Sequence, residues 1–135
     1  GFCSSIGTAG ALMGVSNVLL RSKRKPKIVA LEPESAAFYS KGIRNGKHQV
    51  EGVGLGFELP LLDKDNFNEA RGIDESEARL MVKKLAKHEG IFAGTSTGLN
   101  LVGALQLAKE IGKGRNVVTL ACDSGFKYLN GNLFS

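Results

Sequence analysis

The sequence has no tryptophan and only three prolines, two cysteines and two histidines among its 135 residues. Two cysteines are too few for the disulfide framework of a small secreted scaffold, and both Cys3 and Cys122 fall in apolar, strand-like runs. We therefore predict buried, reduced thiols in a cytoplasmic protein. His48 and His88 lie far apart in the sequence, which argues against a zinc site.

Long apolar runs are also missing. No segment approaches the roughly 18 apolar residues that would span a membrane, and residues 1–3 match the start of a strand rather than a basic leader. We therefore expect neither a membrane partner nor a signal peptide. The length and the ordinary composition, 42% hydrophobic and 23% charged, predict a single domain over residues 1–135.

Positive charge is in excess, with a net charge of +5 and a basic run over residues 21–27. No aromatic residue is interleaved with this run and no known nucleic-acid-binding motif is present, so we expect no nucleic-acid partner. The simpler interpretation places these cations at the C-terminal end of a helix that begins near Ala9. There they would complement the helix dipole before Pro26 stops the helix.

Strand and helix patterns alternate along the chain. The predicted strands are residues 1–6, 27–31, 91–93 and 116–122, and the predicted helices are residues 12–20, 33–38, 74–89 and 97–111. Asp74 and Glu77 form a capping-box pattern, and Gly90 is the expected C-cap. Residues 116–122 are a continuous apolar run, typical of the centre of a parallel sheet. The alternation predicts the α/β class, as a Rossmann-like, open, mostly parallel sheet of about four strands with flanking helices.

A small-residue turn, Gly7-Thr8-Ala9-Gly10-Ala11, joins the first strand to the first helix. Glycine lets the backbone approach a ligand closely, and the first N–H groups of a helix have no partners within the helix. These groups point outward at the positive end of the helix dipole. The turn therefore predicts a phosphate-binding site.

Three further segments follow at suitable distances: the glycine loop 52–57, the turn Gly94-Thr95-Ser96-Thr97-Gly98, and residues 123–129. Ordinary interpretations exist for the last two, because Ser96 or Thr97 can cap the following helix and Asp123 can cap a terminal one. In open parallel sheets, however, ligands bind beyond the carboxyl ends of the strands. Turns that meet at this edge can build one small-molecule site.

Taken in order, these segments resemble the second half of the cysteine synthase (O-acetylserine sulfhydrylase)/cystathionine β-synthase family of fold-type II pyridoxal-phosphate enzymes. The resemblance runs nearly end to end and implies pyridoxal 5′-phosphate as cofactor. It implies that the phosphate is held by Gly7, Thr8, Ala9, Gly10 and Ala11. It further implies that Ser96 hydrogen-bonds the pyridine nitrogen and that Gly52 begins a loop at the entrance of the site.

The turn departs from the family pattern at two positions. The usual loop is Gly-Thr-Gly-Gly-Thr, and this chain has Ala9 and Ala11 at its third and fifth places. Ala9 is tolerable if its backbone does not need a positive φ. Ala11 lacks a hydroxyl donor, which costs about 1 kcal/mol of phosphate binding.

The resemblance also implies a reaction, β-replacement on O-acetylserine or a related activated serine with sulfide to give cysteine. The Schiff-base lysine belongs to the part of the family that precedes Gly1, so we expect no catalytic residue in this chain and no activity from it alone. The expected partners are an amino-acid substrate, the missing N-terminal half and a second copy in a homodimer of the parent enzyme. The alternatives are a truncated, noncatalytic interaction domain, or part of another type II lyase such as cystathionine β-synthase or serine dehydratase.

Overall fold

The computed structural model describes every residue from Gly1 to Ser135. Three parallel strands form one sheet in the order β1 (Phe2–Ser5), β2 (Ile28–Pro33), β3 (Glu69–Ile73). The helices are α1 (Gly10–Leu19), α2 (Phe38–Lys41), α3 (Glu75–Glu89) and α4 (Thr95–Ile111), with short 3-10 turns at Glu34–Ala36, Lys64–Asn66 and Gly125–Tyr128. The predicted α/β class, a parallel sheet with flanking helices, is confirmed.

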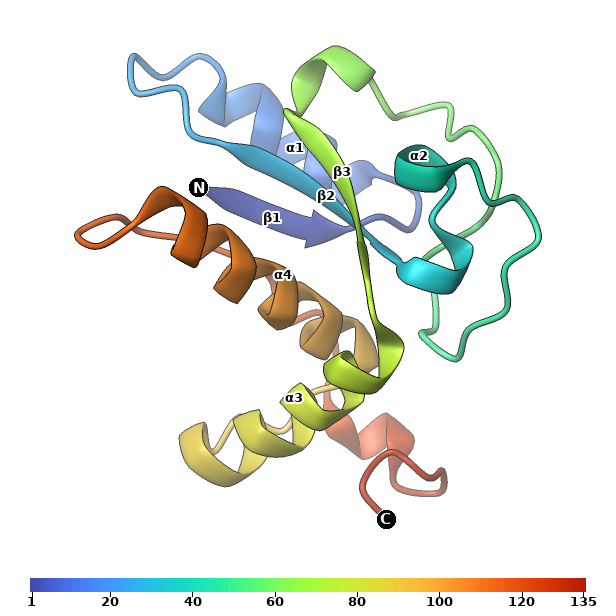
Figure 1. The fold of residues 1–135 in the computed structure, drawn as a ribbon. Coiled ribbons are helices and arrows are strands. Elements are labelled where there is room, and N and C mark those ends of the chain that lie inside the picture. Colours follow the sequence, from blue (N-terminus) through green and yellow to red (C-terminus); the bar gives the residue numbers. More distant parts are fainter.

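Helices cover both faces of the sheet, with α4 along one face and α1 on the other (Figure 1). The period-2 alternation of β2 explains this layering. Val29 and Leu31 pack into the cluster on the α4 side, whereas Ile28 and Ala30 pack into the cluster on the α1 side. All residues of β2 are buried, so β2 is the central strand.

Two strand predictions are wrong, and one strand of the sheet was not predicted. Residues 91–93 and 116–122 are not strands of the sheet, because each makes only an isolated bridge, Ala93 with Ser124 and Val118 with Phe2. The second segment runs along the outer edge of β1, where Val118 is 58% exposed. Cys122 is therefore exposed rather than buried, whereas Cys3 is buried as predicted. The strand β3 was not predicted, because its mixed sequence, with only Ile73 buried, lacks an apolar run.

The predicted ends of α3 are confirmed, whereas one prediction about α1 is wrong. Asp74 caps α3, its carboxylate accepting a hydrogen bond from the Glu77 amide at 3.0 Å, and Gly90 ends α3 in the left-handed conformation, as predicted. The helix α1 ends at Leu19 with no basic residue in its last turn, so the predicted dipole role of the basic run is wrong. The helix α4 is buried on more than one side because it lies between the sheet and α3.

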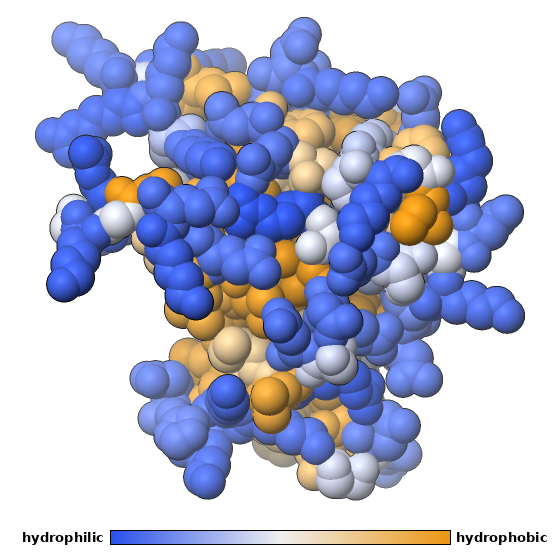
Figure 2. Space-filling model, viewed as in Figure 1, coloured by the Kyte–Doolittle hydropathy of each residue, from blue (hydrophilic) through white to orange (hydrophobic).

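On the face shown in Figure 2, hydrophilic side chains predominate and apolar patches show between them. Two of the most exposed apolar side chains are Val18 and Phe126, at 68% and 72%. No helix of the structure has the length and hydropathy needed to cross a membrane.

Candidate functional site

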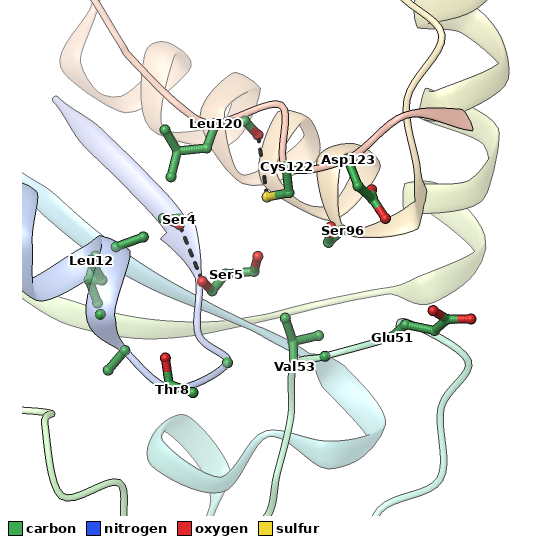
Figure 3. A pocket seen from close by; sticks show the side chains of 15 residues that line it. Ser4, Ser5, Thr8, Leu12, Glu51, Val53, Ser96, Leu120, Cys122 and Asp123 are labelled. Carbon is green, nitrogen blue, oxygen red and sulfur yellow. Dashed lines mark hydrogen bonds between the residues drawn. The ribbon is translucent and has the colours of Figure 1, made fainter. Parts of the chain in front are cut away.

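One pocket of about 360 Å³ collects all the site residues that the sequence predicts (Figure 3). The carboxyl end of β1, the turn before α1, the loop around Gly52 and the first turn of α4 meet there. The predicted residues in its wall are Gly7, Thr8, Ala9, Gly10, Ala11, Gly52 and Ser96. The structure therefore brings the predicted turns together, as expected for the carboxyl edge of a parallel sheet. That these residues bind a cofactor stays a prediction.

The turn before α1 presents a row of free amide donors. The backbone N–H groups of residues 7–12 have no acceptor within the chain, and the first to bond a backbone carbonyl is that of Met13, to the Ala9 oxygen at 2.9 Å. No side chain caps this helix end. The donors and the positive end of the α1 dipole therefore lie at the pocket, where an anion would satisfy them.

Ala9 is the N-cap of α1 and has φ +70°, the left-handed region that favours glycine. Alanine was expected to be tolerated here only if the backbone needs no positive φ, and the structure shows that it does have one. Ala9 is only 3% exposed, and its methyl group packs in the cluster on the α1 side of the sheet. The departure from glycine at this position therefore carries conformational strain.

The glycine loop lies directly against this turn. A Cβ on Gly7 would overlap the carbonyl oxygen of Gly52, so the two backbones are in contact. The Gly54 amide donates to the Ile6 carbonyl at 3.3 Å, which fixes the loop across the end of β1. Gly52, Gly54 and Gly56 all have positive φ, which explains the repeated glycines.

Ser96 lies in the first turn of α4 and is only 6% exposed, yet its hydroxyl forms no hydrogen bond within the chain. The alternative role of Ser96 or Thr97 as a helix cap is wrong, because Gly94 is the N-cap and no side chain caps α4. The Thr97 hydroxyl instead accepts the Cys122 amide at 3.0 Å. Ser96 therefore stands in the pocket wall with a free hydroxyl.

The pocket has a charged side, of which sequence reasoning missed Glu51 and interpreted Asp123 as a helix cap. Glu51 and Asp123 line it, and Lys127 pairs with Glu51 at 2.6 Å, which raises the pKa of the Lys127 ammonium. Asp123 is not the predicted N-cap. Ser124 takes that position, while the Tyr128 hydroxyl donates to Asp123 Oδ2 at 2.8 Å. Glu51 directly precedes Gly52, so its place beside a site motif was the available signal, whereas Asp123 already belongs to the motif 123–129.

The family model described as "Pyridoxal-phosphate dependent enzyme" matches residues 1–123. The chain belongs to this family. Pyridoxal phosphate is therefore the cofactor of the family, as the resemblance implied. No lysine is among the residues that line the pocket.

The relatives and structural neighbours are cysteine synthase-like. Cysteine synthase of Staphylococcus aureus is 38% identical over 134 residues, 99% of this chain and 43% of the relative. O-ureido-L-serine synthase of Streptomyces lavendulae is 35% identical over 133 residues, 98% of this chain and 41% of the relative. The crystal structure of cysteine synthase from Entamoeba histolytica superposes with a TM-score of 0.91 at 30% identity, covering 98% of this chain and 40% of that one. The chain thus spans about two fifths of the length of the curated relatives it matches.

Proposed function

We propose that this chain is the cofactor-binding part of an enzyme that catalyses β-replacement on O-acetylserine, or a related activated serine, with sulfide to give cysteine. The observation that carries the proposal is the row of amides of residues 7–12, which have no acceptor in the chain and share one pocket with Ser96. The similarity to cysteine synthases over almost the whole chain supports the reaction class.

The groups in the pocket fit the phosphate and the ring of the cofactor. The free amides at the start of α1 and the Thr8 hydroxyl would hold the phosphate, which needs many donors and benefits from the helix dipole. Gly52 leaves open space on the side where a Cβ would stand, because nothing lies within 4 Å of that position. The free hydroxyl of Ser96 would bond the pyridine nitrogen at the other side of the pocket.

The chemistry of Ser96 suits elimination and replacement. When bound, pyridoxal phosphate supplies the electron sink that makes loss of an α-proton from an amino acid possible. A serine hydroxyl is uncharged, so it does not hold the ring nitrogen protonated as a carboxylate would, and the sink is weaker. A weaker sink favours reactions in which a leaving group departs soon after the proton is lost.

We further propose that the Schiff-base lysine lies outside this chain. Lys127, the lysine that the structure places beside the pocket residues Glu51 and Asp123, is engaged with their carboxylates. A lysine that forms a Schiff base must instead reach into the pocket in its neutral form. The chain by itself should then bind the cofactor without catalysing β-replacement.

Calorimetric titration of the purified chain tests the proposal. The ligand is pyridoxine 5′-phosphate, which has the ring and the phosphate but no aldehyde to react with surface lysines. We expect Thr8→Ala to weaken binding about tenfold and Ser96→Ala about threefold, because the first removes a hydrogen bond to a charged group and the second to a neutral one.

Ser22→Ala is the matched control, because it removes an exposed hydroxyl that is not part of the pocket. It should leave the affinity unchanged. Binding that neither Thr8→Ala nor Ser96→Ala weakens, or no binding at all, would contradict a cofactor site within this chain.

A further inference from the structure

The turn that carries Ser96 is held from one side by the segment 122–128. The Gly94 amide donates to the Asp123 carbonyl at 3.1 Å, and the Gly125 amide donates to the Phe92 carbonyl at 3.0 Å. Between them, Ala93 and Ser124 form an antiparallel bridge. The position of Ser96 in the pocket therefore depends on a segment that is distant in the sequence.

The Asp123 carboxylate and the Tyr128 ring fill the space over Gly94. A Cβ on Gly94 would overlap both Asp123 Oδ1 and the ring, so glycine is required for this close approach. Asp123 Oδ1 is buried without a hydrogen-bond partner, whereas Oδ2 accepts from the Tyr128 hydroxyl at 2.8 Å. A buried, unpaired carboxylate oxygen is unfavourable, so the orientation of Asp123 depends on the partners of Oδ2. These are the Tyr128 hydroxyl at 2.8 Å and the exposed Lys127 ammonium at 3.9 Å, of which only the first is within hydrogen-bond distance.

Tyr128 keeps its proton for this bond. Burial and the hydrogen bond to Asp123 raise the pKa of the Tyr128 hydroxyl to about 12. The group is therefore a donor throughout the neutral range, and the Asp123 carboxylate is held in one orientation against Gly94.

We propose that the Asp123–Tyr128 pair is a positioning unit that sets Ser96 at the ring end of the site. The inference rests on the proposed function. The unit contacts Gly94, two residues before Ser96, whereas the amides of residues 7–12 that would hold the phosphate belong to a different segment of the pocket wall. Loss of the Tyr128 hydroxyl should therefore weaken recognition of the ring and leave recognition of the phosphate intact.

Two ligands separate these effects: pyridoxine 5′-phosphate, which has ring and phosphate, and inorganic phosphate, which has no ring. Because the chain has no tryptophan, binding can be followed by the fluorescence of pyridoxine 5′-phosphate without interference from tryptophan emission. We expect Tyr128→Phe to lower the affinity for pyridoxine 5′-phosphate about fivefold, the value of one hydrogen bond, and to leave that for phosphate within about twofold.

Substitution of Asp123 gives a second, independent comparison. Asp123→Asn keeps an oxygen that can accept from Tyr128, so it should lose less affinity for pyridoxine 5′-phosphate than Asp123→Ala, which should resemble Tyr128→Phe. Tyr39→Phe is the matched control, because the hydroxyl it removes accepts the Leu59 amide at 2.7 Å, outside the pocket.

The outcomes are distinct. An unchanged affinity of Tyr128→Phe for pyridoxine 5′-phosphate would overturn the inference, and so would an equal loss for both ligands, which would indicate a general structural role. Failure of Asp123→Asn to rescue the loss seen in Asp123→Ala would also overturn it. If the wild-type chain binds pyridoxine 5′-phosphate no better than phosphate, the proposed function itself fails and the inference fails with it.

Discussion

Replacement of Ala9 by glycine tests whether the turn before α1 is strained. Ala9 has φ +70° and is 3% exposed at the N-cap of α1. An L-residue in the left-handed region costs about 1 to 2 kcal/mol, which Ala9→Gly would remove. Two terms oppose this gain. The greater freedom of glycine in the unfolded chain costs about 0.4 to 1 kcal/mol, and the lost burial of one methyl group costs about 0.8 kcal/mol.

These terms nearly cancel, so the free energy of unfolding of Ala9→Gly should lie within about 0.8 kcal/mol of wild type. A buried alanine in ordinary helix provides the control. Ala104 lies in α4 and is 8% exposed. With no strain to relieve, Ala104→Gly should lose about 1 kcal/mol of helix propensity and about 0.8 kcal/mol of burial.

Urea unfolding of the two variants, followed by far-ultraviolet circular dichroism, measures the difference. We expect Ala104→Gly to be the less stable by about 2 kcal/mol, as a lower midpoint at an unchanged slope. Ala9→Gly should also bind pyridoxine 5′-phosphate at least as tightly as wild type, because glycine adopts the turn conformation without strain. Equal destabilisation by the two substitutions would refute the strain argument.

Two further predictions concern buried and capping polar groups. Asn100 is fully buried, and its side chain accepts the Ser5 amide at 2.6 Å and donates to the Leu120 carbonyl at 2.9 Å. Asn100→Leu should lower the free energy of unfolding by about 2 to 3 kcal/mol, because it leaves the Ser5 amide and the Leu120 carbonyl without their hydrogen-bond partner. In urea unfolding, a loss below about 1 kcal/mol would contradict this expectation. Hydrogen bonds from the Ser76 hydroxyl and the Glu77 amide lower the pKa of Asp74 in the folded state. The ionised carboxylate therefore stabilises the folded state at pH values above the pKa of the unfolded chain, which is about 4. This stabilisation is lost as the pH falls through the lower pKa of the folded state. The free energy of unfolding of wild type should therefore exceed that of Asp74→Asn, which keeps the cap, by about 0.3 to 1 kcal/mol at neutral pH. In urea unfolding the difference should vanish in strong acid, and a difference that persists there would contradict the assignment of the stabilisation to the Asp74 charge.

The parts of the fold that were predicted correctly depend on neighbours in the sequence. The cap of α3 by Asp74 and its termination at Gly90 are set within a few residues, and both are confirmed. Residues 27–31 were likewise predicted as a strand, and β2 occupies Ile28–Pro33. The prediction that residues 116–122 form a central strand was wrong for the opposite reason. An apolar run does not reveal whether a segment lies at the centre of a sheet or along its edge.

The candidate site divides in the same way. The turn 7–11, Gly52 and Ser96 could be chosen from the sequence because each belongs to a motif, and the structure brings them to one pocket. Glu51 and Asp123 belong to the same pocket, but their inclusion depends on how the loop and the last segment pack. The positive φ of Ala9 was equally hidden, since alanine gives no local signal for a left-handed backbone.

By itself, then, the sequence determined the α/β class, the family and the motifs that meet in the candidate site, because these follow from residue order and local conformational preference. Only the tertiary structure decided the exposure of Cys122, the strain at Ala9 and the bond between Tyr128 and Asp123 beside Gly94. The reason is physical. Such features arise where segments distant in the sequence pack against each other, so they depend on the packing of the whole chain rather than on neighbouring residues.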